Sequence, residues 1–298
     1  MLFDYSHIKI DVLEDNWLRE KNISLSVLRL DAIHRVISGN KLFKLHYFLE
    51  DISSGKILIT FGGAYSNHLA ATAYACKLSN IKCIGIVRGE KPKELSHTLK
   101  QCLNDGMELR FVSREIYDQK EDDGFLKKLE EEFKESIVIP EGGYHFKGAK
   151  GVAMIMDLIP DNTTHVCCAV GTATTLAGLL MNHKQKKIIG VPVLKGMHDI
   201  ESRISFLSEN NVDLKQLALL NEYHFGGYAK KTDELITFMN ELHKRYQLPT
   251  DFVYTGKMMY AIFDQIKKGM FASGSNIVCI HTGGLQGNLS LPKGTLFF

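Results

Sequence analysis

Two short stretches of the chain hold side chains that can do chemistry. In the first, Gly39-Asn40 precedes Lys41, and apolar residues at helical spacing follow, so Asn40 is predicted to cap a helix that begins with a lysine. A lysine is unusual there because the helix dipole favours anions. The same environment lowers the pKa of an amine and makes it more reactive toward carbonyl compounds. Lys41 is therefore a candidate nucleophile, although this stretch alone also fits a solvated surface lysine.

The second stretch lies after a continuous apolar run at 57–61. Gly62-Gly63 ends that run, and Ser66-Asn67-His68 begins a segment rich in alanine with helical character. Backbone N–H groups at a helix N-terminus bind anions, so this start is a candidate site for a carboxylate. An ordinary helix cap explains Ser66, but not the whole Gly-Gly-x-x-Ser-Asn-His string.

A third candidate is the loop at 171–175, which reads Gly-Thr-Ala-Thr-Thr and follows another apolar run. A glycine and three hydroxyls between a strand and a helix can hold a phosphate. No Gly-Lys-Ser/Thr follows, and the loop is not G-x-G-x-x-G, so a single phosphate fits better than ATP or a dinucleotide. Taken alone, the loop fits a hydroxyl-rich helix cap about as well.

The elements that would position these residues alternate between strand and helix. Apolar, β-branched runs separated by helical segments are typical of a parallel sheet in an α/β fold. Predicted strands lie at 23–30, 56–61, 83–87, 108–112, 137–139, 166–170, 188–193, 221–225 and 277–280. Predicted helices lie at 41–54, 66–78, 92–103, 125–133, 147–158, 198–207, 233–246 and 257–268, with one more after 178. In such sheets ligands bind at the carboxyl ends of the strands, so the glycine-rich turns at 62–63, 142–143, 171 and 283–284 are expected to meet at one site.

Composition excludes several classes of function. The chain has 298 residues, is 45% hydrophobic and 23% charged, and carries a net charge of +2, which is too small to indicate nucleic acid or membrane binding. The N-terminus has no signal-peptide pattern, and no apolar run is long enough to span a bilayer. The six cysteines show no C-x-x-C and the histidines no metal-binding spacing, so we expect reduced core cysteines, no metal and a cytoplasmic location.

Five motifs in order extend this interpretation to a family. They are Ser-Gly-Asn-Lys-x-x-Lys at 38–44, Gly-Gly-x-x-Ser-Asn-His at 62–68, the loop at 171–175, Tyr-Thr-Gly-Lys at 254–257 and His-Thr-Gly-Gly at 281–284. Together they resemble the 1-aminocyclopropane-1-carboxylate (ACC) deaminase/D-cysteine desulfhydrase family, which comprises pyridoxal-phosphate enzymes of the tryptophan synthase β-subunit fold. The resemblance runs from about residue 25 to the C-terminus.

The resemblance implies a fold and an assembly. The fold would be α/β, with two open, mostly parallel sheets and flanking helices. Residues 46–149 would form a smaller domain, and 1–45 with 150–298 a larger domain that binds pyridoxal 5'-phosphate. The protein would be a homodimer that acts on a small amino acid.

The resemblance also implies roles for individual residues. Lys41 would bond the cofactor aldehyde and carry the α-proton of the substrate. Ser66 and His68 would hold the substrate carboxylate together with Asn67, which would also bond the phenolic oxygen of the cofactor, and Ser66 would be a candidate for proton handling. The cofactor phosphate would be bound by Lys44, Gly171, Thr172, Ala173, Thr174 and Thr175. Tyr228, Tyr254 and Thr255 would line the substrate side, the two tyrosines as catalytic candidates, and Thr282 would meet the pyridine nitrogen.

Three positions bear on the reaction. Deaminases of the resembled family carry a glutamate where this chain has Thr255, an apolar residue at Thr282 and a glutamine at His68. A hydroxyl cannot protonate the pyridine nitrogen as a carboxylic acid can, so the cofactor would be a weaker electron sink. A weaker sink suffices for β-elimination of a thiol, and we therefore expect D-cysteine desulfhydration to pyruvate, ammonia and sulfide. The alternatives are ACC deamination to 2-oxobutanoate and ammonia, and a non-catalytic protein that binds a phosphate ligand.

Overall fold

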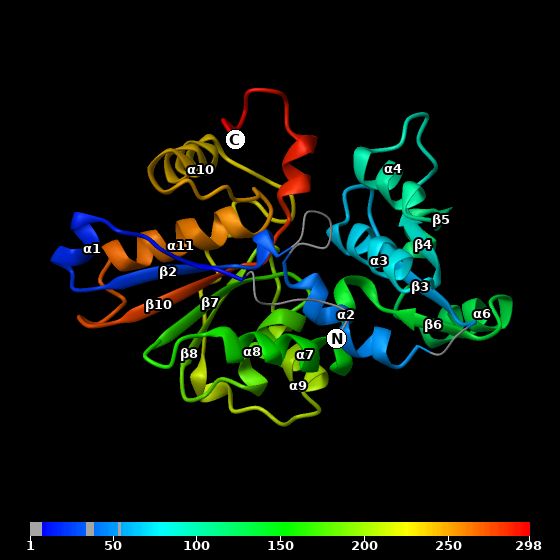
Figure 1. Cartoon of the computed structure of the whole chain (residues 1–298), viewed down its shortest axis with the longest axis horizontal. Helices are drawn as coiled ribbons and strands as arrows, with labels where there is room; N and C mark the ends of the chain where they lie inside the picture. The colour runs from blue at the N-terminus through cyan, green and yellow to red at the C-terminus, as the bar shows by residue number, and fades with distance from the viewer. Residues whose placement is uncertain (1–7, 34–38, 53–54) are drawn as a thin grey trace.

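The computed structural model of the chain describes residues 8–33, 39–52 and 55–298, so Ser38 of the first motif lies outside the described residues. The chain forms two sheets with helices on both faces of each (Figure 1). Apart from β1, all their strands run parallel to their neighbours, which confirms the predicted α/β class with two mostly parallel sheets.

The larger sheet has the strand order β1-β2-β10-β7-β8-β9. These strands are β1 (Ile10–Val12), β2 (Ser24–Arg29), β10 (Asn276–His281), β7 (His165–Val170), β8 (Lys187–Pro192) and β9 (Leu217–Leu219). One face is covered by α7 (Phe146–Ala153), α8 (Thr174–Met181) and α9 (Ile200–Leu207), and the other by α1 (Asn16–Glu20), α10 (Asp233–Tyr246) and α11 (Thr255–Lys267) (Figure 1). Successive residues of β7 belong to different cores: Val166 and Cys168 to the core that includes α8, Cys167 and Ala169 to the core that includes α11. The continuous apolar run of β7 is thus explained by burial on both faces.

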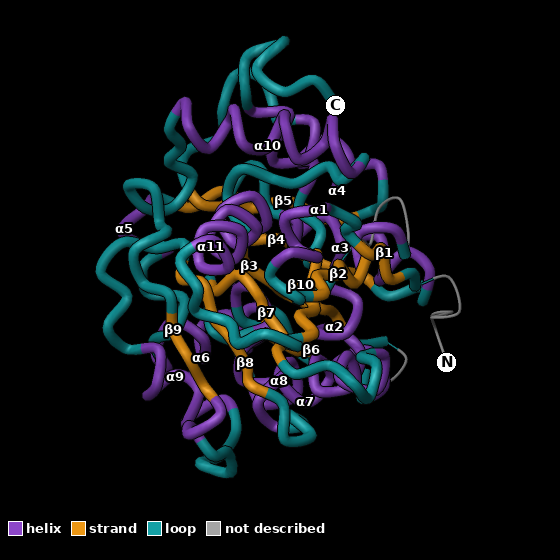
Figure 2. Tube along the Cα trace, turned by 90° about the vertical axis from the view of Figure 1, so that its left-hand side faces the viewer, coloured by secondary structure: helices purple, strands orange, loops and turns teal. Residues whose placement is uncertain are grey.

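The smaller sheet has the order β5-β4-β3-β6 and lies behind the larger one in Figure 2. Its strands are β5 (Met107–Val112), β4 (Lys82–Arg88), β3 (Ile57–Gly62) and β6 (Ser136–Ile139). The helices of this part of the chain are α3 (Asn67–Leu78), α4 (His97–Asn104), α5 (Arg114–Tyr117) and α6 (Asp123–Glu132). This sheet falls inside the range 46–149, and the division into two domains at those residues stays a prediction.

Helix α2 (Lys41–Glu50) connects the two sheets and carries both lysines of the first motif. Glycines let it pack closely: a Cβ on Gly151 of α7 would lie 1.9 Å from the carbonyl oxygen of Phe43 in α2. A Cβ on Gly178 of α8 would likewise lie 2.4 Å from the carbonyl oxygen of Ala149 in α7. Close backbone approach through α2, α7 and α8 therefore fixes Lys41 relative to the loop at 171–175.

Several predicted elements differ from the structure. The helix predicted at 41–54 ends at Glu50, and the one predicted at 147–158 is an α-helix only to Ala153 and continues as a 3-10 helix. The helix expected from 92 begins only at His97, because the side chain of Ser96 accepts the N–H of Leu99 and caps it there. The strand expected at 221–225 is a series of turns, and the sheet instead gains β9, three half-buried residues that pair with β8. Short 3-10 helices cover Leu30–Ala32 (η1), Glu141–Gly143 (η2), Met154–Leu158 (η3), Leu214–Gln216 (η4) and Leu285–Ser290 (η5).

The six cysteines are all buried, as predicted for core cysteines, and all are free. Across the described ranges, no helix combines the length and the apolar character needed to cross a membrane. Within those ranges there is also no group of three or more His, Cys, Asp or Glu that could hold a metal ion.

Candidate active site

A cavity of about 620 Å³ lies at the carboxyl ends of the strands of both sheets. Gly63 after β3, Gly142 after β6, Gly171 after β7 and Gly284 after β10 all line it, so the four glycine-rich turns meet at one site, as predicted. A narrower space of about 70 Å³ extends between α2 and the start of α8. Lys41, Asn67, Gly142, Gly171, Thr172 and Tyr254 line both spaces. We call the smaller one the inner cavity.

Lys41 is the first residue of α2 and lines the inner cavity. The turn before it requires glycine, because Gly39 has φ +77° and a Cβ there would lie 1.8 Å from the carbonyl oxygen of Thr282. The Lys41 Nζ donates to the side-chain oxygen of Asn40 at 2.6 Å. Burial lowers the pKa of Lys41 to about 8, against the opposing charge of Asp251. The pKa shift that the sequence predicted is therefore present, with desolvation as its main cause.

Asn40 does not cap α2 with its side chain, contrary to the prediction. Its amide instead donates to the hydroxyl of Thr175 at 2.6 Å while its oxygen accepts from Lys41. Asn40 is buried, so these bonds link the start of α2 to the start of α8.

The inner cavity has the donors of a phosphate site. Its wall is the start of α8, where Ala173 has φ +66° and the hydroxyls of Thr172 and Thr174 lie 2.9 Å apart. Lys44 is buried, and its Nζ donates to the carbonyl of Gly142 at 2.8 Å. Burial, together with the charge of Lys41, holds the pKa of Lys44 well below its usual value.

No carboxylate lines the inner cavity among the residues that the structure describes. Two lysines, four threonines and a helix N-terminus therefore surround a space that favours an anion. This donor set fits the phosphate of pyridoxal phosphate, with Lys41 beside it for the aldehyde.

Ser66, Asn67 and His68 lie together at the start of α3 and line the larger cavity. The Ser66 hydroxyl oxygen accepts the N–H of Leu69 at 3.2 Å, so its own hydrogen stays available to a ligand. The side-chain oxygen of Asn67 is buried without a hydrogen-bond partner. A buried amide with an unmet bond beside Lys41 is consistent with a bound group that is polar on this side.

The ring of His68 can only accept a hydrogen bond at Nδ1, the nitrogen that does not contact Thr60. The Thr60 hydroxyl donates to the carbonyl of Ile139 at 2.8 Å, so Thr60 must accept from His68 Nε2 at 2.9 Å. Burial, with the charges of Lys41 and Lys44, lowers the pKa of His68 to about 3, so the ring is neutral. The bare Nδ1 has no partner and cannot donate to a carboxylate. If His68 binds the substrate carboxylate as predicted, it must therefore do so through its backbone N–H at the start of α3 and not through its ring.

Tyr228 and Tyr254, the two tyrosines predicted to line the substrate side, lie next to each other on the side of the cavity formed by the larger sheet. Their ring centroids are 6.2 Å apart at an interplanar angle of 71°, and burial raises the pKa of Tyr254. Lys257, fully buried in α11, donates to the carbonyls of His224 and Gly227 at 2.8 and 2.7 Å. Lys257 thereby fixes the turn that precedes Tyr228, a role that its place in the sequence motif did not reveal.

Thr255 and Thr282 are placed differently. Thr282, which was predicted to meet the pyridine nitrogen of the cofactor, lines the inner cavity. Thr255 is buried and lines neither space, and its hydroxyl donates to Asp251 at 2.7 Å and accepts the N–H of Asp251 at 2.8 Å. The hydroxyl of Thr255 is thus engaged within the protein.

Asp251 is a residue of the candidate site that the sequence analysis missed. It is buried, lines the larger cavity, and accepts the backbone N–H groups of Val253, Tyr254 and Thr255 at 2.8–2.9 Å. These bonds fix the turn that leads into α11. An aspartate a few residues before a helix is a recognisable cap signal, but its closeness to Lys41 depends on the tertiary fold.

Comparison with known proteins places this site in context. Residues 19–283 match the family model described as "Pyridoxal-phosphate dependent enzyme". A Pyrococcus furiosus protein named "Putative 1-aminocyclopropane-1-carboxylate deaminase" is 30% identical over 293 residues, covering 91% of this chain and 88% of the relative. A Thermotoga maritima protein of the same name is 30% identical, covering 91% and 92%. A crystal structure described as "the ACC deaminase homologue" superposes with a TM-score of 0.80 at 28% identity, covering 97% of this chain and 92% of the other.

Proposed function

Because this chain belongs to the family of pyridoxal-phosphate dependent enzymes, we propose that it is a lyase or deaminase of small amino acids that catalyses β-elimination from a D-cysteine-type substrate. The products would be pyruvate, ammonia and sulfide. The proposal rests on the lining of the inner cavity, where two lysines and the threonines at the start of α8 suit the phosphate of the cofactor and Lys41 lies beside it for the aldehyde.

One observation carries the choice of reaction. Among the described residues, the inner cavity is lined by hydroxyls, amides and lysines, with Thr282 and without any carboxylic acid. Opening a cyclopropane ring calls for a strong electron sink, whereas loss of a thiol from the β-carbon makes a weaker demand. A lining without an acid therefore supports elimination.

Each residue of the site would have its own role in this reaction. Bound pyridoxal phosphate supplies the electron-withdrawing system that stabilises negative charge at the substrate α-carbon. Lys41, with a pKa of about 8, is partly neutral near physiological pH and can accept a proton. The N–H groups at the start of α3 and the free hydrogen of Ser66 would bind the substrate carboxylate. Tyr254 has a raised pKa, so it keeps its proton and can donate a hydrogen bond.

ACC deamination to 2-oxobutanoate and ammonia is the second candidate. It is supported by the names of the Pyrococcus and Thermotoga relatives and of the structural neighbour. The buried carboxylate of Asp251 in the larger cavity also supplies an acidic group close to the site, although four donors already engage it.

A panel of amino acids read out as keto acid tests the proposal. The purified protein should be yellow with pyridoxal phosphate, and Lys41→Ala should abolish the visible absorbance. D-cysteine should yield pyruvate faster than the cyclopropane substrate yields 2-oxobutanoate, with L-cysteine as the stereochemical control. The reverse order would establish the second candidate, and a colourless protein without cofactor uptake would refute both.

The homodimer stays part of the proposal. Light scattering of the purified protein tests it, since a monomer and a dimer of this 33.6 kDa chain differ twofold in mass.

A further inference from the structure

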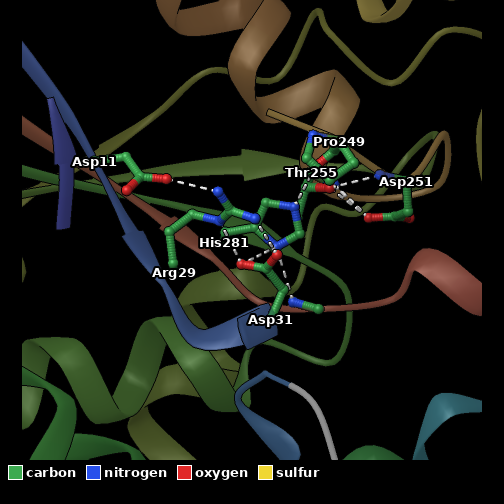
Figure 3. A network of polar contacts seen from close by, with 8 residues as sticks. Asp11, Arg29, Asp31, Pro249, Asp251, Thr255 and His281 are labelled. Carbon is green, nitrogen blue, oxygen red and sulfur yellow. Dashed lines mark hydrogen bonds and ion pairs between the residues drawn. The ribbon is translucent and has the colours of Figure 1, made fainter. Parts of the chain in front are cut away.

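A network of charged side chains, buried at its inner end, reaches the end of β10 (Figure 3), next to the inner cavity. Arg29 bonds Asp31 through two nitrogens, at 2.9 and 2.8 Å, and donates to Asp11 at 2.6 Å. Asp31 also lies 3.2 Å from His281 Nδ1, and both of these side chains are less than 5% exposed, at 4% and 1%. His281 stands beside Arg29 in the parallel register of β10 and β2. The network therefore connects the N-terminal strands to the residue just before Thr282.

The hydrogen on one nitrogen of His281 is fixed by its partner. Nε2 lies 2.8 Å from the carbonyl oxygen of Pro249, which can only accept, so Nε2 carries a hydrogen. Nδ1 has two competing neighbours at similar distance. The N–H of Gly283 approaches it at 3.3 Å and requires a bare nitrogen, whereas the carboxylate of Asp31 at 3.2 Å requires a protonated one. The two arrangements exclude each other.

The charge balance of the network distinguishes these arrangements. With a neutral His281, the two carboxylates of Asp11 and Asp31 face one cation, Arg29, and the lone pair of Nδ1 lies against an oxygen of Asp31. A second proton on His281 removes the repulsion between Nδ1 and Asp31, which matters because both side chains are buried in a site of low dielectric, whereas Asp11 is 41% exposed and its charge is screened by water. Its cost is the Gly283 N–H, which then lacks an acceptor within the protein.

A ligand can supply that acceptor, because Thr282 and Gly283 line the inner cavity. We infer that His281 is a positioning residue that carries protons on both ring nitrogens when the cofactor is bound, pairing with Asp31 and freeing the Gly283 N–H for the cofactor. Binding of pyridoxal phosphate would then take up a proton at His281. The inference concerns the cofactor and holds whichever substrate the enzyme uses.

The same pairing supports Lys41. The carbonyl of Thr282 accepts the N–H of Asn40 at 3.4 Å and is the surface against which Gly39 packs. On the other side, the N–H of Gly39 bonds the carbonyl of Leu30 at 2.8 Å, next to Asp31. The contact between His281 and Asp31 thus joins the two segments, at Leu30 and Thr282, that accept hydrogen bonds from the turn before Lys41.

Other charged groups near His281 have their own partners. Asp251, from the segment that contains Pro249, accepts a hydrogen bond from the hydroxyl of Thr255 (Figure 3). It also accepts three backbone N–H groups. Lys41 donates to Asn40. Of the charged residues in the network, Asp31 contacts His281 directly and Arg29 lies beside it in the strand register. Asp31 is therefore the residue to substitute in a test.

The experiment compares Asp31→Asn with Asp11→Asn. Each removes one carboxylate bonded to Arg29, but only Asp31 contacts His281. The affinity of the cofactor-free protein for pyridoxal phosphate is measured by absorbance at several pH values. We expect Asp31→Asn to weaken binding about tenfold at neutral pH, a change of about 1.4 kcal/mol, and Asp11→Asn about twofold or less. Proton uptake further predicts that the ratio of wild-type to Asp31→Asn affinity falls as the pH rises.

Nitrogen NMR of the His281 ring tests the proton directly, with the signal assigned by its loss in His281→Asn. Two protonated ring nitrogens in the cofactor-bound wild type are the expected result. A single protonated nitrogen in that state would overturn the inference even if Asp31→Asn failed to fold. Equal cofactor affinities of the two aspartate variants at every pH would overturn it as well.

Discussion

Asp251 and Lys41 show how single residues set the reactivity of this site. Burial lowers the pKa of Lys41 to about 8, and the negative charge of Asp251 opposes that change. Replacing Asp251 with asparagine keeps its shape and removes its charge, so the pKa of Lys41 should fall further. A lower pKa leaves more of the neutral amine at a given pH, and neutral amine is the form that attacks an aldehyde.

We therefore predict that Asp251→Asn shifts the pH midpoint for capture of pyridoxal phosphate by the cofactor-free protein below about 8. The rate of absorbance change after mixing, measured across pH, gives this midpoint. Asp199→Asn is the matched control, because Asp199 also lines the cavity but pairs with Arg203 at 2.6 Å. An unchanged or raised midpoint in Asp251→Asn would show that its charge does not act on Lys41.

At the scale of an element, the turn before α2 depends on one glycine. Alanine at position 39 would combine a left-handed φ of +77° with a Cβ 1.8 Å from the carbonyl oxygen of Thr282. Gly55, beyond the end of α2, has φ +91° and nothing within 4 Å of its Cβ position. Gly55→Ala should therefore cost only the backbone strain, about 1–2 kcal/mol in unfolding free energy.

Gly39→Ala should cost clearly more than Gly55→Ala in urea unfolding, because Thr282 or α2 must move. It should also weaken cofactor binding, since that movement displaces Lys41. Similar losses in the two variants, with cofactor affinity intact, would mean that the turn adapts without moving α2.

The elements also show what the sequence could predict. Strands such as β3 and β7 were predicted because apolar runs buried on both faces leave a continuous signal in the chain. The start of α4 was misplaced because a single side chain, Ser96, decides it, and β9 was missed because its half-buried residues pair only with an edge. The glycine turns and Lys41 were identified from local motifs. The effect of the Asp251 charge on Lys41, and the contact between His281 and Asp31, join segments far apart in the sequence, so only the fold reveals them.

At the scale of the whole molecule, the cavity contains a buried amine that lowers the stability of the cofactor-free protein and favours binding of an anion. Helix α2 brings Lys44 into a buried position between the two sheets, where its pKa is held well below its usual value by burial and by Lys41. An amine in such a place has lost hydration and gains one bond, to the carbonyl of Gly142. An anion in the inner cavity would compensate Lys44, so the cofactor should stabilise the whole fold.

Lys44→Met tests this relation, because methionine fills a similar volume without the amine. We predict that the cofactor-free variant is at least as stable as the wild type toward urea, since no buried amine remains to be desolvated. The wild type should gain about 2.7 kcal/mol of unfolding free energy when pyridoxal phosphate is present at 100 times its dissociation constant. At that same cofactor concentration the variant should gain much less, because weaker binding contributes less stabilisation by mass action. A variant that is less stable alone and gains as much as the wild type would show that Lys44 serves packing and not the anion.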